Sequence, residues 1–249
     1  MSENQPKNVL GFVLLKDANF DWPRFKHNLK EDWDIEFSDE IKDGSVVFSA
    51  EDMTCACSLM PTPIPNGEAE ACAKNNPLWK NGAEETAKHG AHVMIAVMDG
   101  GDRLEQNKLF VKLASSMLKL KNTIGIYKNP TVFESSFYAD VAENLKRGDL
   151  PIPIMLHVGM YINKETRLCA FTYGMKAYGF EEMEVIGSTA QAPELYSFML
   201  ALADYVISQD AVLVDGDTVG FTEEQKLSVT YSDAVSFEGK SLKIGYKTE

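Results

Sequence analysis

The chain has few basic residues and no long apolar run, and each shortage argues against a class of protein. Its 249 residues include 24 Lys and Arg against 37 Asp and Glu, a formal net charge of −13. Proteins that bind nucleic acids contact phosphates through clustered Lys and Arg, so we expect no nucleic-acid partner. No apolar run approaches the roughly 18 residues of a membrane span, and the polar N-terminus lacks the layout of a signal peptide. We therefore expect a cytoplasmic protein without a membrane partner.

Cysteine and histidine are also scarce, and their spacing does not indicate a metal site. The four cysteines have no CxxC spacing, which argues against both a zinc site and a disulfide framework. Cys55 and Cys57 alternate along an expected strand, so both side chains point to one face as small hydrophobic groups. His89 and His92 lie across an element boundary without a third ligand, so we interpret them as capping or core residues. We expect neither a metal nor a cofactor.

Catalytic motifs are missing as well. The chain contains four histidines, and it has no Gly-x-Ser-x-Gly, no His-Glu-x-x-His and no P-loop. Residues 99–102, Asp-Gly-Gly-Asp, follow an apolar strand, but their two aspartates would repel a phosphate, so we predict a turn. We assign no catalytic residue. Whether the chain is an enzyme stays open, and these absences favour a non-catalytic protein.

What the chain does contain is a globular composition, with 45% hydrophobic and 10% aromatic residues. Short apolar segments predict strands, and amphipathic segments between them predict helices. One helix is marked by Asp21 as N-cap and by Pro23 in its first turn. Another follows Phe133, Phe137, Val141 and Leu145, spaced four apart. The expected strands cover residues 9–15, 45–48, 53–60, 91–98, 123–127, 152–162, 168–175, 182–187, 211–214, 227–231 and 242–246.

The first strand and helix recur as a pattern later in the chain. The shift that places residues 11–15 on residues 123–127 also superimposes the apolar positions of the two following helices. We therefore predict an α+β fold of two ferredoxin-like βαββαβ halves that form one pseudo-duplicated unit. The halves would cover residues 1–102 and 123–249, the latter with extra C-terminal strands, joined by a helix over 103–122. An irregular α+β domain with helices on one sheet face is the alternative.

Two segments are candidate partner-binding surfaces, and the first is residues 60–70, Met-Pro-Thr-Pro-Ile-Pro-Asn-Gly-Glu-Ala-Glu. Three alternating prolines hold its backbone extended, which predicts a rigid docking edge at Ile64 and Asn66. Glu68 and Glu70 would then present negative charge to a basic partner. A structural interpretation is also open, in which Asn66 caps a helix and the two glutamates complement its dipole.

The second candidate surface is the aromatic-rich segment 171–180, expected to form part of a long hairpin. Its glycines allow tight bending, and Tyr173, Tyr178 and Phe180 are residue types favoured at protein interfaces. The alternative is an ordinary hairpin whose aromatic side chains cover the core.

Several blocks of the sequence resemble a bacterial family of domains of unknown function. These blocks are residues 11–16 (Gly-Phe-Val-Leu-Leu-Lys), 20–22 (Phe-Asp-Trp), 60–70, 172–175 (Thr-Tyr-Gly-Met), 220–221 (Gly-Phe) and 225–227 (Gln-Lys-Leu). The resemblance runs over nearly the whole chain, and the proline block is its most specific part. It implies a bacterial cytosolic protein that forms one full-length unit, and it carries no catalytic residue over to this sequence.

Together these features predict a non-catalytic cytosolic protein-binding factor, such as an immunity or adaptor protein. An acidic surface steers a basic partner toward it, and a basic toxin is one example of such a partner, although acidity also serves solubility. The alternative is an enzyme or small-molecule-binding protein with a site in the groove between the two halves. A homo-oligomer, with a large apolar self-interface, is a further possibility.

Overall fold

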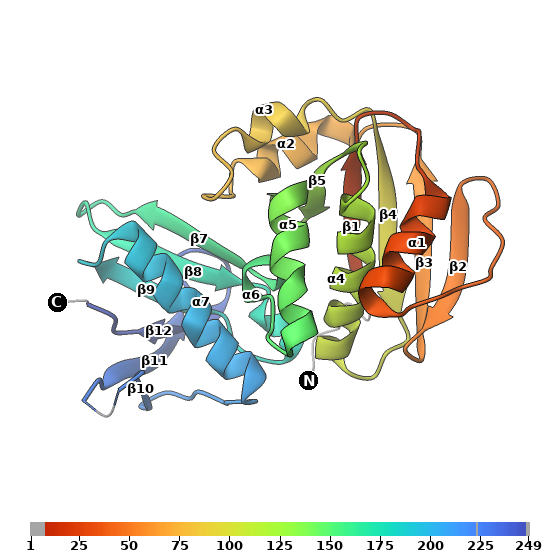
Figure 1. Ribbon diagram of the computed structural model, residues 1–249. Helices are drawn as coiled ribbons and strands as arrows, with labels where there is room; N and C mark the ends of the chain where they lie inside the picture. Colours follow the sequence, from red (N-terminus) through yellow and green to blue (C-terminus); the bar gives the residue numbers. More distant parts are fainter. Residues whose placement is uncertain (1–7, 223, 248–249) are drawn as a thin grey trace. The chain divides into compact units, whose positions relative to one another are not determined.

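Two separate six-stranded sheets organise the chain (Figure 1). The computed structural model describes residues 8–222 and 224–247. The chain divides into two compact units, the first ending at Ile154 and the second beginning at Met155. An α+β fold is therefore confirmed, and the two units are described in turn below.

The sheet of the first unit has the order β2-β3-β4-β1-β5-β6, and every neighbouring pair is antiparallel. Its strands are β1 (Val9–Leu15), β2 (Ser45–Ala50), β3 (Met53–Met60), β4 (Ala91–Met98), β5 (Thr123–Lys128) and β6 (Thr131–Glu134). The turn between β2 and β3 is formed by Glu51 and Asp52, both at positive φ.

The helices of the first unit cover both faces of this sheet (Figure 1). They are α1 (Trp22–Trp33), α2 (Glu68–Ala73), α3 (Gly82–Thr86), α4 (Arg103–Leu118) and α5 (Ser135–Ala142), with 3-10 turns at Pro65–Gly67 and Glu143–Arg147. The short α6 (Ile152–Met155) contains the chain position at which the two units divide. Gly11 faces α4, where a Cβ would come within 2.5 Å of the Phe110 ring, whereas Leu14 packs against Ala69 and Ala73 of α2. Strand β1 is thus buried on both faces, as its apolar run predicts.

Local capping signals in the sequence account for the starts of two helices. The Asp21 carboxylate accepts the Arg24 N–H at 2.9 Å, which confirms the predicted N-cap of α1. Asp102 does the same for α4, accepting the Leu104 N–H at 2.7 Å. The chain therefore bends at residues 99–102, where a turn is predicted, and Asp102 also caps α4, which was not predicted.

The sheet of the second unit has the order β10-β11-β12-β9-β8-β7, in which β9 and β12 are a parallel pair. Helix α7 contacts β7 and β8, and Leu195, Met199 and Leu202 on its inner side are fully buried. The elements are β7 (His157–Ile162), β8 (Leu168–Tyr173), a 3-10 turn (Met175–Tyr178), β9 (Met183–Ser188), α7 (Ala192–Ser208), β10 (Thr218–Val219), β11 (Leu227–Asp233) and β12 (Lys240–Ile244).

The predicted ferredoxin-like duplication is not confirmed. The second unit begins with the antiparallel strands β7, β8 and β9 and has one long helix, so its element order differs from βαββαβ. Strand β5 pairs with β1, and Phe133, expected on a helix, lies in β6. Residues 123–134 therefore complete the first sheet, and the observed division falls at 154/155 rather than within the expected linking segment 103–122. Periodicity alone did not reveal which strands pair.

Candidate functional site

The proline loop, residues 61–66, is held in place by two buried histidines. The Ile64 N–H donates to His89 Nε2 at 2.8 Å, and His89 Nδ1 donates to the Thr86 carbonyl at 2.6 Å. His92 Nδ1 donates to the Thr62 carbonyl at 2.8 Å, and burial lowers the pKa of His92. Both histidines are core residues, as predicted, and their ring nitrogens bond to backbone groups of the loop and of α3.

The four residues predicted to bind a partner in this loop and at the start of α2 are mostly engaged within the first unit. Ile64 is buried in a cluster with Leu14, and the Glu68 carboxylate accepts the Tyr127 hydroxyl at 2.5 Å. Glu70 Oε1 lies 3.6 Å from His89 Nδ1. Asn66 is exposed at a φ of 58°, and it does not cap a helix, because α2 starts after Gly67 without a side-chain cap. These contacts hold the loop through Ile64, its one buried residue, whereas the other residues of 61–66 remain exposed.

The second predicted segment, residues 171–180, contributes more to the surface. Strand β8 ends at Tyr173, which is 43% exposed, and the chain turns instead of continuing a hairpin. The buried Glu182 carboxylate fixes this turn by accepting the Gly174 N–H at 2.7 Å. Tyr178 donates its hydroxyl to the Met155 carbonyl at 3.3 Å, and burial raises its pKa. Tyr178 is therefore an anchor, whereas Tyr173 is presented to solvent.

A groove of about 390 Å³ lies beside Phe180 in the second unit. It forms because residues 211–214, expected to be a strand, run on from the end of α7 without joining the sheet. Val212 and Val214 are therefore 74% and 53% exposed, and Tyr231 on β11 is 40% exposed. The apolar lining consists chiefly of Phe180, Val206, Val212, Val214, Tyr231 and Leu242.

The charged residues that line this groove in the described part of the chain are both acidic, Glu181 and Asp215. Asp215 Oδ1 accepts the Tyr231 N–H at 2.7 Å, which fixes the segment 211–215 against β11. Burial and the nearby Glu181 carboxylate raise the pKa of the Tyr231 hydroxyl, so this phenol stays protonated. The groove therefore combines an apolar floor with a negatively charged rim.

Exposed apolar side chains also concentrate in the second unit. Of the twelve large hydrophobic side chains exposed in residues 8–222 and 224–247, eight belong to this unit. Its sequence from Met155 onward contains 14 acidic and 7 basic residues. Three of the eight, Val212, Val214 and Tyr231, line the groove beside Phe180, so the second unit carries the better candidate surface.

Sequence reasoning found Phe180 but missed the rest of this groove. Val212 and Val214 were interpreted as part of a strand, which would have buried them. The available signal was the dipeptide Asp215-Gly216 directly after an apolar run, which indicates a turn at an exposed position.

The cysteines and the acidic clusters give no metal-binding group in the described residues. Burial raises the pKa of the Cys55 thiol to about 12, and Cys57 is fully buried beside it, so both are small hydrophobic groups, as predicted. No group of three or more His, Cys, Asp or Glu in this part of the chain is arranged to hold a metal ion. Among the helices described, none combines the length and the apolar character that crossing a membrane requires.

Fold and site together define an α+β protein with an apolar, acid-rimmed groove. Residues 171–245 match the family described as Domain of unknown function (DUF4261). The match begins in β8 and ends just after β12, so it contains the residues that line the groove. No curated protein and no solved structure matches the chain.

Proposed function

We propose that the chain is a non-catalytic protein-binding factor that recognises a basic partner through the groove beside Phe180. The observation that carries this proposal is the pairing of exposed apolar residues with two carboxylates on one concave surface. An apolar side chain of the partner enters the groove, and a neighbouring Lys or Arg meets Glu181 or Asp215. The apolar contact supplies affinity, and the charges supply partner choice and association rate.

The residues predicted from the sequence take two roles in this proposal. Phe180 lines the binding groove, whereas Tyr173 is exposed at the end of β8 and does not line it. Ile64, Glu68, Glu70 and Tyr178 hold their segments in shape, and Asn66 is a peripheral contact. An immunity or adaptor role, a bacterial cytoplasmic origin and a family resemblance over the whole chain remain part of the proposal.

Affinity capture with matched variants tests this function. The bait is the full chain, compared with Val212→Ser and Glu181→Gln, which remove the most exposed apolar side chain and one rim charge. Val47→Ser is the control, because Val47 on β2 is 59% exposed and lies in the first unit. We expect to capture a basic protein that binds the wild type and the Val47→Ser control equally. It should bind each groove variant about tenfold more weakly. High salt should weaken the binding further, because it screens the charges.

Three outcomes contradict the proposal. One is a partner captured equally by all four baits, and another is no specific partner at all. The third is capture of a second copy of the chain, which would assign the groove to self-association.

A further inference from the structure

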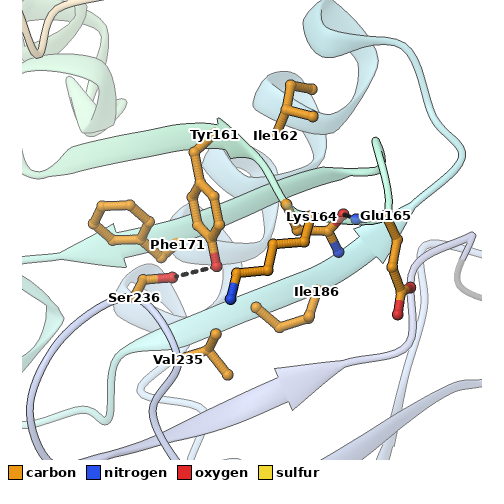
Figure 2. A pocket seen from close by; sticks show the side chains of 9 residues that line it. Tyr161, Ile162, Lys164, Glu165, Phe171, Ile186, Val235 and Ser236 are labelled. Atoms are coloured by element: carbon orange, nitrogen blue, oxygen red, sulfur yellow. Dashed lines mark hydrogen bonds between the residues drawn. The ribbon is translucent and has the colours of Figure 1, made fainter.

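A second pocket, of about 600 Å³, lies wholly within the second unit and away from the groove beside Phe180. The registers of β7, β8 and β9 place Tyr161, Phe171 and Ile186 on one face of the sheet, where they form its floor. Val235 and Ser236, from the loop between β11 and β12, form a wall (Figure 2). This volume is within the range of small-molecule sites.

The pocket has a polar end that is rich in hydrogen-bond donors. The Ser236 hydroxyl donates to the Tyr161 phenol oxygen at 3.4 Å, and the Cys169 thiol is a further hydrogen-bond neighbour of this phenol. Burial raises the pKa of Tyr161, so the phenol keeps its proton. In Figure 2 the Lys164 side chain reaches across the pocket toward these two hydroxyls, whereas the Glu165 carboxylate points away from them.

Lys164 is the only cation among the lining residues, and it has no carboxylate partner in the described part of the chain. Its turn is rigid because Asn163 Oδ1 accepts the N–H groups of Glu165 and Arg167, each at 3.0 Å. The Asn163 N–H also donates to the Arg167 carbonyl at 2.9 Å. The ammonium group is thus carried on a fixed turn at the mouth of the pocket.

The opposite wall is fixed by a buried carboxylate. Glu184, with 0% exposure, accepts the Ser236 N–H at 2.7 Å and the Val235 N–H at 3.1 Å. The Lys243 ammonium lies 2.7 Å from the same carboxylate and compensates its charge, and the Ser241 hydroxyl donates to it at 2.6 Å. The pocket is therefore pre-organised, and the negative charge behind its wall is neutralised.

From this arrangement we propose that the pocket binds a small organic carboxylate, with its apolar body against Phe171, Ile162 and Ile186. The carboxylate meets the Lys164 ammonium and the Tyr161 hydroxyl. Lys164 would repel a cationic ligand. A neutral ligand would bind less well than a carboxylate, because it would remove water from the Lys164 ammonium without supplying a negative charge in return. A free organic acid and the C-terminal carboxylate of a peptide share this chemistry. This binding site is separate from the protein-binding groove.

Calorimetric titration of the full chain with matched probes tests the ligand class. The probes are 4-phenylbutyrate, the isosteric neutral 4-phenylbutyramide and the cationic 4-phenylbutylamine. We expect the carboxylate to bind about tenfold more tightly than the amide and the amine not to bind. A parallel titration uses N-acetylphenylalanine, which mimics the C-terminus of a peptide, in place of 4-phenylbutyrate. Tighter binding of N-acetylphenylalanine would indicate a peptide ligand, and tighter binding of 4-phenylbutyrate would indicate a free organic acid.

Substitution of the cation tests the site. Lys164→Gln should weaken carboxylate binding about tenfold and leave amide binding unchanged, and Tyr161→Phe should weaken it about threefold. Lys176→Gln is the control, because Lys176 is exposed in the same unit and does not line the pocket. Equal binding of carboxylate and amide, equal effects of the two lysine variants, or no carboxylate binding would overturn the assignment. None of these results bears on the capture experiment with the Val212 and Glu181 variants. Failure of the carboxylate-site proposal would therefore leave the protein-binding proposal untouched, and the reverse also holds.

Discussion

The backbone N–H of Ile64 donates to Nε2 of His89 at 2.8 Å, across 25 positions of the sequence. Because Nε2 accepts this bond while Nδ1 donates to the Thr86 carbonyl, the ring is a neutral imidazole with a defined tautomer. A protonated ring would carry hydrogens on both nitrogens and could not accept the Ile64 N–H. The shape of the proline loop therefore depends on a neutral His89.

His89→Phe is expected to destabilise the protein and loosen the proline loop. The substitution leaves the buried Ile64 N–H without an acceptor, a loss of about 1–3 kcal/mol in the free energy of unfolding. Urea unfolding measures the loss, and hydrogen exchange at the Ile64 amide locates it. His27→Phe is the control, because His27 is exposed and pairs with Glu31 on its own helix. Unchanged protection of the Ile64 amide would contradict the interpretation.

His157 is expected to make stability depend on pH in the mildly acidic range. Burial lowers the pKa of its imidazole from 6.5 to about 4. Between these values the unfolded chain binds a proton that the folded chain does not, so stability is full above pH 6.5 and falls toward pH 4. The accumulated loss is about 3 kcal/mol. His157→Phe should make the free energy of unfolding depend less on pH when urea unfolding is measured at pH 7.5, 6, 5 and 4.5. A slope equal to that of the wild type would refute the assignment.

Glu184→Gln is expected to be among the most destabilising single substitutions in the second unit. The change removes a fully buried charge whose carboxylate holds Val235 and Ser236, and it leaves the Lys243 ammonium unpaired. We expect a loss of about 3 kcal/mol at pH 7, measured by urea unfolding. Glu238→Gln, in the exposed loop between β11 and β12, is the control and should change little.

The Glu184 carboxylate is also expected to make the free energy of unfolding fall at acidic pH. Burial raises the pKa of Glu184, but the hydrogen bonds that it accepts, above all from Lys243, outweigh this and lower the pKa to about 2. Its stabilisation is therefore present above pH 4.5 and lost as the pH falls toward 2. The Glu184→Gln variant should therefore lose less free energy of unfolding between pH 4.5 and pH 2 than the wild type. An equal loss in the two proteins would contradict the stabilising role of the ionised Glu184 carboxylate.

The cysteines are expected to differ sharply in reactivity. Cys72 is partly exposed on α2, whereas Cys55, Cys57 and Cys169 are buried, and none of the four forms a disulfide. A thiol reagent should therefore label one cysteine rapidly in the native protein and all four after unfolding. Cys72→Ser should abolish the rapid phase. A rapid phase that persists in this variant would show that a buried strand opens.

Much of the local structure could be predicted from the sequence, because its causes lie within a few residues. Asp21 starts a helix by accepting an N–H group from the next turn, and Cys55 and Cys57 share a buried face because strand side chains alternate. The candidate site was predicted only in part. Phe180 and Tyr173 lie at the surface, but Ile64 and Tyr178 are held by contacts that no local pattern indicates.

The sequence by itself determined the α+β class, the acidic character and the positions of most helices and strands, since these follow from composition, capping and side-chain periodicity. The tertiary structure decided which strands pair, because pairing joins residues far apart in the chain, as β1 with β5. It also decided that residues 211–214 stay outside the sheet, since a strand needs a partner as well as a propensity. Both pockets depend on such distant contacts. The Glu184 carboxylate, for example, is buried and ionised only because Lys243 and a loop about fifty residues away fold against it.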